Sequence, residues 1–158
     1  MSPRAAWRLA TLGFEHVYDY VGGKADWLAH GLPREGDEAV ELYAADLLEA
    51  QRATCRLDDD LATVTRTLHD ASAGFCLVVT DGDVLLGRVR RSALEGAPAD
   101  ATAEQLMEPG PSTVRADTLA RELVERLASR DLKTAIVTTP EGRLLGVFSR
   151  VAAERRLR

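Results

Sequence analysis

The residues in this sequence best suited to binding chemistry are arginines that gather near its C-terminus. A guanidinium group donates paired hydrogen bonds to phosphate or carboxylate oxygens, so such a cluster could form a phosphate-binding patch. The ordinary alternative is that these side chains solvate one face of a C-terminal helix. Both interpretations stay open from the sequence alone. The cluster consists of Arg143, Arg150, Arg155, Arg156 and Arg158.

Aspartates form a second group with a chemical use. Asp58, Asp59 and Asp60 precede one segment of periodic apolar residues, and Asp117 precedes another. Neighbouring carboxylates suit a metal ion, but acidic side chains beside the unpaired amides of a helix N-terminus commonly cap that helix. We expect capping.

The residue types that usually carry catalysis show no productive arrangement. His16, His30 and His69 lack mutual metal-ligand spacing, and no Ser-His-Asp set, glycine-rich phosphate loop or paired-carboxylate motif stands out. Cys55 and Cys76 lie in apolar, strand-like stretches without redox-motif spacing, so we expect two small buried hydrophobic residues. The sequence therefore predicts a non-catalytic protein that requires no cofactor and no metal.

The amino-acid composition argues against two classes of partner, nucleic acids and membranes. The formal net charge of -5 argues against nucleic acid, which selects for basic surfaces. No apolar run approaches the length of a membrane helix, and the N-terminus lacks the apolar stretch of a signal peptide, so we expect a cytoplasmic protein without a membrane partner. The 158 residues, 46% of them hydrophobic, suffice for one compact domain or two very small ones.

An internal repeat is the strongest organising feature of the chain. Residues 45–94 align with residues 104–153 without a gap, with Gly146 following Gly87 by 59 positions. Ungapped agreement over this length is hard to obtain by chance. The matching pairs include Leu47 and Leu106, Glu49 and Glu108, Thr54 and Thr113, Arg56 and Arg115, Leu68 and Leu127, Val78 and Val137, Leu85 and Leu144, and Arg91 and Arg150.

Each copy predicts the same series of elements: strand, helix, strand, strand, helix. Apolar residues recur at helical spacing in the helix, and a polar turn with Gly82 or Gly142 joins the last two strands into a hairpin. One unit alone leaves a sheet face uncovered, so we expect an α/β (α+β) fold in which two units pack through their sheets. The expected strands are 55–57, 75–79 and 84–89 in the first copy and 114–116, 135–137 and 144–148 in the second.

Two stretches of the second copy resemble a known family, the cystathionine-beta-synthase (CBS) domain. Residues 106–114 (LMEPGPSTV) are similar to the segment that enters this domain, and residues 141–149 (EGRLLGVFS) are similar to its terminal hairpin. The family occurs as tandem pairs, called Bateman modules, and the resemblance covers about residues 45–153. It implies one CBS repeat at 45–98 and a second at 99–158.

The CBS resemblance implies a cleft between the repeats that binds adenosine compounds such as ATP, ADP or AMP. In binding members a hydroxyl residue and an aspartate follow the last strand and contact phosphate and ribose. Here Ser149 keeps the hydroxyl, but Ala152 and Ala93 replace the two aspartates and Arg90 replaces the first hydroxyl. We therefore expect weak ribose recognition and a preference for polyphosphate ligands.

The resemblance also assigns the residues of that cleft. Ser112, Leu132, Thr134, Ile136, Ser149 and Arg150 would line the second-repeat cleft, and Arg90, Arg91 and Arg150 would pair with phosphates. Two functions remain open: a nucleotide-sensing regulatory module that acts on an unknown effector protein, and a structural dimerisation or scaffold module with degenerate, empty clefts. The family pattern implies a homodimer in either case.

The N-terminal segment resembles a different family. Residues 12–18 (LGFEHVY) and 22–33 (GGKADWLAHGLP) are similar to the C-terminal end of a rhodanese (sulfurtransferase) domain, which implies a remnant at 1–36. No cysteine precedes Cys55, so the rhodanese mechanism is excluded; the segment is a retained fragment, or upstream sequence is missing. We expect an unpaired strand at Val17–Tyr20 that packs on the repeats or on a second chain, and the start of a linker helix at 37–44.

Overall fold

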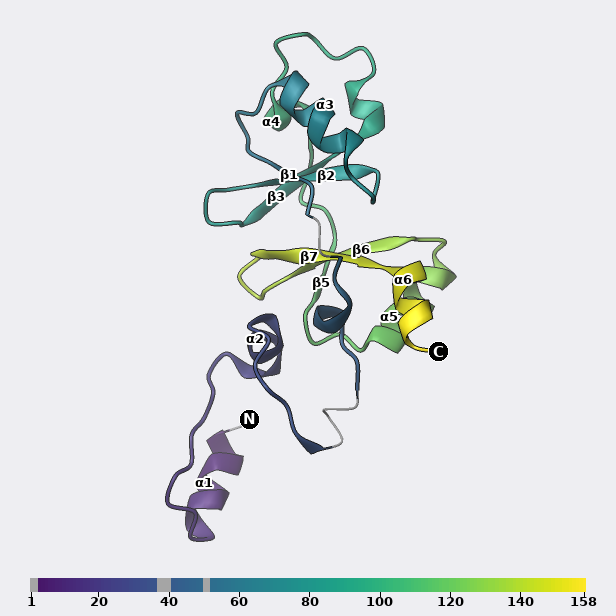
Figure 1. Cartoon of the computed structure of the whole chain (residues 1–158). Helices are drawn as coiled ribbons and strands as arrows, with labels where there is room; N and C mark the ends of the chain where they lie inside the picture. The colour runs from purple at the N-terminus through teal and green to yellow at the C-terminus, as the bar shows by residue number, and fades with distance from the viewer. Residues whose placement is uncertain (1–2, 37–40, 50–51) are drawn as a thin grey trace.

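The computed structural model describes residues 3–36, 41–49 and 52–158. Two small sheets with their helices lie one above the other, and the N-terminal segment extends away from them, so the molecule is elongated (Figure 1). We call residues 52–109 the first packing unit. Residues 41–49 together with 113–157 form the second packing unit.

The first packing unit contains a four-stranded sheet of order β1-β2-β3-β4, in which β1 is parallel to β2 and the other pairs are antiparallel. Helix α3 packs on one face of this sheet, with Val64 and Leu68 fully buried. Asp60 caps α3 by accepting a hydrogen bond from the Thr63 amide at 2.8 Å, as expected from its position. The elements are β1 (Thr54–Cys55), α3 (Leu61–His69), β2 (Phe75–Val79), β3 (Leu85–Arg90), the 3-10 helix η3 (Arg91–Leu94), α4 (Ala103–Leu106) and β4 (Glu108–Pro109).

The second packing unit repeats this plan with a three-stranded sheet of order β5-β6-β7. The hairpin registers match at the repeat spacing: Phe75 pairs with Arg90 in the first sheet, and Thr134 pairs with Ser149 in the second. The mixed α/β fold with two repeated units is therefore confirmed. The elements are β5 (Thr113–Arg115), α5 (Ala120–Ser129), β6 (Thr134–Thr138), β7 (Leu144–Ser149) and α6 (Arg150–Arg156).

The first segment of each repeat packs with the other unit. The 3-10 helix η2 (Ala44–Leu47) lies against α5 and β7, and the Glu49 amide donates to the Val147 carbonyl at 2.9 Å. In the same way α4 and β4 join the first packing unit, where the Ala103 amide donates to the Asp59 carbonyl at 2.9 Å. A boundary after residue 98 divides the sequence repeats but not the packing units, because backbone hydrogen bonds tie residues 101–109 to the first unit.

The two sheets pack face to face, as the repeat predicts. Leu77, Val79, Ile136, Leu144 and Val147 are buried between them. The hairpin loops add reciprocal backbone hydrogen bonds, from Leu144 to Asp83 at 2.8 Å and from Leu85 to Gly142 at 3.0 Å. These partners are related by the repeat spacing, so the contact has approximate two-fold symmetry.

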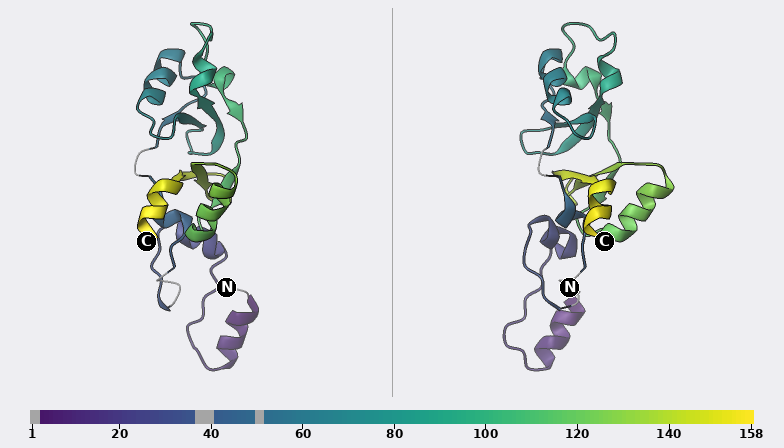
Figure 2. Two further views of the ribbon diagram at one scale, coloured as in Figure 1. Left: turned by 90° about the vertical axis from the view of Figure 1, so that its right-hand side faces the viewer. Right: turned by 45° about the vertical axis from the view of Figure 1, so that its right-hand side comes forward.

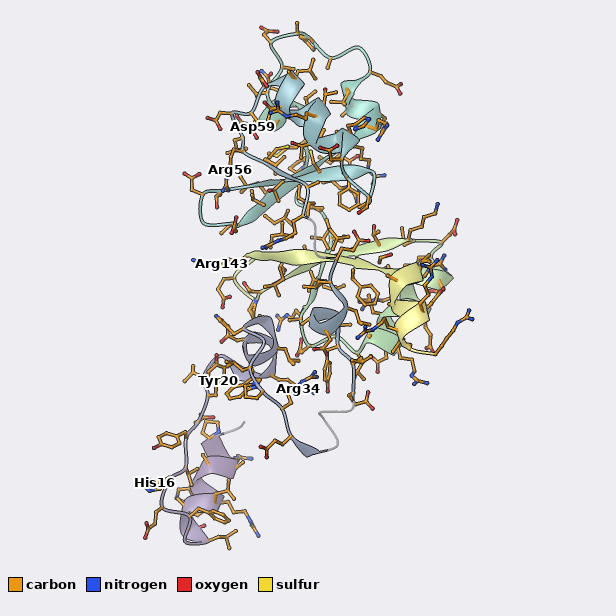
Figure 3. The ribbon with its side chains drawn as sticks, viewed as in Figure 1. His16, Tyr20, Arg34, Arg56, Asp59 and Arg143 are labelled. Atoms are coloured by element: carbon orange, nitrogen blue, oxygen red, sulfur yellow. The ribbon has the colours of Figure 1, made fainter. Side chains whose placement is uncertain are left out.

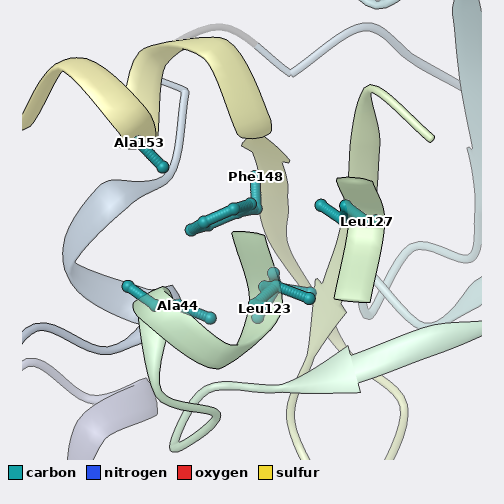
Figure 4. Packing of buried hydrophobic residues seen from close by; sticks show 7 residues of the cluster. Ala44, Leu123, Leu127, Phe148 and Ala153 are labelled. Atoms are coloured by element: carbon teal, nitrogen blue, oxygen red, sulfur yellow. The ribbon is translucent and has the colours of Figure 1, made fainter. Parts of the chain in front are cut away.

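Each unit also has its own apolar core on the helix side of its sheet. In the second packing unit, Phe148 is completely buried among Ala44, Leu123, Leu127 and Ala153 (Figure 4). Ala44 comes from η2, so the exchanged segment is part of this core. Two views from other directions show the helices of both units on the outer faces of the paired sheets (Figure 2).

The N-terminal segment differs from expectation. Val17–Tyr20 does not form a strand, because no neighbouring strand offers it backbone partners there. Helix α1 (Pro3–Thr11) has no buried residue, whereas α2 (Gly23–Ala29) docks on the second unit through Leu28. The side chains of Tyr20 and Arg34 lie beside α2 (Figure 3).

The expected linker helix at 37–44 is not seen in its described part. Residues 37–40 lie outside the described residues, residues 41–43 are not helical, and the 3-10 helix begins at Ala44. The Tyr43 backbone is extended because it bridges to Leu119 of the second packing unit. Within the described ranges, no helix is both long and apolar enough to cross a bilayer.

Candidate ligand-binding cavities between the packing units

A cavity of about 560 Å³ opens where β3 of the first unit meets β5, β6 and the end of α5 of the second, and we call it the basic cavity. Its size suits a drug-sized or nucleotide-sized ligand. Among the described residues that line it are five cationic side chains and no carboxylate. The lining consists of Ala73, Phe75, Arg88, Arg90, Ser112, Thr113, Val114, Leu123, Arg126, Leu127, Arg130, Leu132, Lys133, Thr134, Ala135 and Ile136.

Secondary structure brings the cations together. Arg88 and Arg90 are two residues apart on β3 and therefore point to the same face of the sheet. Arg126 lies in the last turn of α5 and Arg130 follows its end, four residues later, so both lie on one side of the helix. Lys133 follows in the loop before β6 and adds a fifth positive charge.

Glu108 already neutralises part of this charge. It lies directly opposite Arg88 in the β3–β4 pair, and its carboxylate accepts from Arg88 Nε at 2.9 Å. A second oxygen lies 3.0 Å from Arg90 Nε. The hydrogen bond from Arg88 is the main reason that the pKa of Glu108 is lowered. The carboxylate therefore stays ionised at neutral pH and competes with any anion for the two arginines.

The basic cavity also has apolar lining residues. Phe75, Leu132 and Ile136 contribute side chains, and Ser112 and Thr134 add hydroxyl groups at the strand beginnings. Apolar and hydroxyl side chains in the same cavity as several cations can hold a flat heterocycle that bears phosphates.

A second cavity occupies the position related by the repeat spacing, and we call it the acidic cavity. It encloses about 240 Å³, and its residues Ala53, Thr54, Phe75 and Leu77 correspond to Ser112, Thr113, Thr134 and Ile136. Glu49 and Asp70 line it together with the single cation Arg52. Ser72 donates to the Glu49 carboxylate at 2.7 Å. Carboxylates in so small a space disfavour a polyphosphate.

The basic cavity unites five of the eight residues that sequence reasoning assigned to the site. Ser112, Leu132, Thr134 and Ile136 line it as expected, and Arg90 joins them from the other repeat. Each cavity takes its first strand and helix end from one repeat and its terminal strand from the other.

The remaining three expected residues do not line either of these two cavities. The Ser149 hydroxyl caps α6 by accepting from the Ala152 amide at 3.5 Å. Arg150 points along α6, with Nε 3.9 Å from Glu154, and Arg91 donates to the Leu68 carbonyl at 3.5 Å. Ser149 and Arg150 lie elsewhere because β7, the terminal strand of their repeat, faces the acidic cavity through Val147, and Arg91 lies beyond the end of β3, in η3.

Sequence reasoning missed Arg88, Arg126, Arg130, Lys133 and Phe75. The sequence shows that Arg88 and Arg90 are two residues apart on a predicted strand and that Arg126 and Arg130 are four residues apart on a predicted helix. It does not show that this face of the strand meets this side of the helix. The late arginine cluster is not one patch: Arg143 lies on the β6–β7 hairpin, at the opposite end of the sheet from α6 (Figure 3). Arg155 and Arg156 are exposed on α6, as the solvated-helix interpretation predicts.

Comparison with known proteins agrees with this architecture. Residues 103–152 match the family model of the CBS domain. The chain is 29% identical over 123 residues to arabinose 5-phosphate isomerase KpsF from Escherichia coli O6:H1 (strain CFT073), covering 78% of this chain and 33% of that protein. The chain thus spans a third of the length of this curated relative.

Solved structures share the fold at low identity. The cytosolic domain of the Mg²⁺ channel MgtE in complex with ATP superposes with a TM-score of 0.62 at 22% identity, covering 75% of this chain and 50% of that one. The CBS domain pair of protein MJ0100, in complex with 5′-methylthioadenosine and S-adenosyl-L-methionine, gives 0.59 at 14% identity, covering 74% and 96%. Residues 103–152 thus match the CBS-domain family, and the chain has the fold of solved CBS-domain pairs.

Proposed function

We propose that the chain is a non-catalytic regulatory module that senses an adenine nucleotide in the basic cavity and relays its occupancy to an effector protein. One observation carries the proposal: five cationic side chains join apolar and hydroxyl side chains in lining a pocket of nucleotide size at the junction of the two units. MgtE and MJ0100 share the fold and were solved with adenosine compounds, which supports the ligand class.

The charge distribution sets the expected ligand preference. Ala93 and Ala152 offer no carboxylate for a ribose, so affinity must come from the base and the phosphates. Three of the cations form no ion pair among the described residues, so their charges are available to phosphates; these are Arg126, Arg130 and Lys133. We expect ATP and ADP to bind more tightly than AMP, and adenosine least.

The position of the basic cavity gives a route for the signal. Its walls belong to both packing units, so a ligand that contacts both stabilises one relative arrangement of the sheets. The effector would read that arrangement on the outer surface. A homodimer, a cytoplasmic location and a rhodanese-derived origin of residues 1–36 are further parts of this proposal.

One observation favours the alternative, a scaffold with an empty cavity. Glu108 already pairs with Arg88 and Arg90, so one of the five positive charges is balanced and two arginines are engaged without a ligand. In that case the arginines serve to tie β4 to β3, and the module acts only through its surface.

Thermal unfolding with added ligands separates the two functions. A ligand at about 100 times its Kd stabilises by about 2.7 kcal/mol, which raises the Tm of a chain this size by about 5 to 10 °C. We expect this response with ATP or ADP, a smaller one with AMP and little with adenosine.

Two variants on α5 provide the matched comparison. Arg126→Gln removes a cation that lines the basic cavity, whereas Arg121→Gln removes an exposed cation on the same helix that does not. The proposal requires that Arg126→Gln weakens the ATP response and Arg121→Gln does not. If no adenine compound changes the Tm at millimolar concentration, nucleotide sensing is rejected and the scaffold function is supported.

A further inference from the structure

The two cysteines, 21 positions apart in the chain, lie in contact inside the first packing unit. The Sγ atoms of Cys55 on β1 and Cys76 on β2 are 3.3 Å apart, and both thiols are reduced. Their exposed fractions are 2% and 0%, within the core that Val64, Leu68 and Val89 complete. The sequence-based expectation of two buried residues is confirmed, but their contact was not foreseen.

The strand register explains the contact. β1 and β2 are parallel, and Cys55 lies opposite Val78, two residues beyond Cys76. Residues two apart on a strand share a face, so both thiols point to the helix side of the sheet as diagonal neighbours. A disulfide bond is about 2.05 Å long, so the sulfurs need to approach by little more than 1 Å.

We propose that Cys55 and Cys76 are a redox modification site that closes to an intramolecular disulfide when a peroxide reaches it. Closure requires side-chain rotation and a small slide of β1 along β2. The site is independent of nucleotide binding in the basic cavity, since neither cysteine lines that cavity.

The local chemistry designates Cys55 as the attacking thiol. Donation from the Cys76 thiol to the Cys55 sulfur stabilises a Cys55 thiolate, which lowers the pKa of Cys55 and raises that of Cys76. The Thr67 hydroxyl also favours the Cys55 thiolate. Burial acts against ionisation at both residues, so the pair is a slow site that reacts when the sheet opens locally.

The reaction is balanced with a peroxide as the oxidant. The Cys55 thiolate attacks one oxygen of hydrogen peroxide, the O–O bond breaks, and the departing hydroxide takes up a proton as water, leaving a sulfenic acid on Cys55. The Cys76 thiolate then attacks Sγ of Cys55, the S–O bond breaks, and a second water leaves. Two thiols and one peroxide become one disulfide and two waters.

The acidic cavity lies directly behind this site. Thr54 precedes Cys55, and Phe75 and Leu77 flank Cys76; all three line the cavity on the opposite face of the sheet. Thr67, which contacts Cys55, lines it as well. Sliding β1 along β2 therefore changes the shape of the acidic cavity.

Mass spectrometry of the folded wild-type chain tests the proposal directly. After treatment with hydrogen peroxide and alkylation of remaining thiols, we expect a monomer about 2 Da lighter with no alkylated cysteine, and full reversal by a phosphine reductant. Proteolysis should yield one linked peptide pair that contains both cysteines. The proposal is overturned if the folded chain keeps both thiols, or if the disulfide joins two chains.

Single variants test the assigned roles. In Cys76→Ser the hydroxyl keeps a donor to the Cys55 sulfur but cannot close a disulfide, so a dimedone probe should label the Cys55 sulfenic acid about tenfold more than it labels Cys76 in Cys55→Ala. Equal labelling, or stronger labelling of Cys76, contradicts the assignment of Cys55 as the attacking thiol. Circular dichroism of each variant verifies folding, and the wild-type mass measurement remains decisive if a variant unfolds.

Discussion

Replacing Glu108 by glutamine should strengthen ATP binding in the basic cavity. The glutamate carboxylate lies 2.9 Å from Arg88 Nε and 3.0 Å from Arg90 Nε, so it occupies hydrogen bonds that a phosphate needs. Glutamine keeps the shape and removes the charge. These side chains are partly exposed, so the effective dielectric is close to that of water, and one unit charge about 4 Å away changes a Kd about fivefold.

Isothermal titration calorimetry measures this effect. We expect the Kd for ATP to fall about fivefold in Glu108→Gln at low ionic strength, and the gain to shrink near 1 M salt, where the Debye length is about 3 Å. The matched control is Glu49→Gln, the equivalent residue of the acidic cavity, which should leave ATP binding unchanged. Equal gains in both variants, or weaker binding in Glu108→Gln, would refute the reasoning, since Glu108 would then position the arginines rather than compete with the ligand.

Three further results follow from the packing and the ion pairs. Phe148→Ala empties a completely buried site and should lower the free energy of unfolding by about 3–5 kcal/mol in urea titrations, whereas Val151→Ala on the exposed side of α6 should change it little. Gly87→Ala should cost about 1–3 kcal/mol in the same assay because the added Cβ comes within 2.9 Å of the Glu108 carbonyl, and Gly146→Ala should cost less because its nearest neighbour is a leucine side chain at 3.3 Å. Because Arg88 lowers the pKa of Glu108, its ion pairs stabilise the fold above the ordinary glutamate pKa and are lost as the pH falls through the lowered value. The Tm difference between wild type and Glu108→Gln should therefore be full at neutral pH, shrink below the ordinary glutamate pKa and disappear below the lowered value.

The repeat made much of the fold predictable. The constant spacing between the two copies, seen for example between Gly87 and Gly146, predicted two equivalent sets of strands and helices. Because each sheet needs a cover for one face, the sequence also implied that the two sheets pack together. Reasoning by resemblance failed at the N-terminal segment, where the string at 12–33 predicted a strand. A strand needs a partner for its backbone groups, and Val17–Tyr20 has none in the described structure.

The candidate site was only partly predictable. Ser112, Thr134 and Ile136 follow the family pattern within one repeat, and the structure brings them to one cavity. Arg88 and Lys133 were missed, since nothing local indicates that β3 of one repeat completes the cavity of the other. That juxtaposition depends on the face-to-face packing of the sheets and on the segments that cross between the units.

By itself, the sequence determined that the chain is a tandem α/β module with a formal charge of -5 and with alanines at positions 93 and 152, where the resemblance implies an aspartate. Only the tertiary structure decided that five cations gather in one cavity, that Glu108 pairs with two of them, and that Cys55 contacts Cys76. Spacing along the chain reports which residues share a face of one helix or strand. Which faces meet is set by strand register and sheet packing, which bring together residues that no local pattern connects.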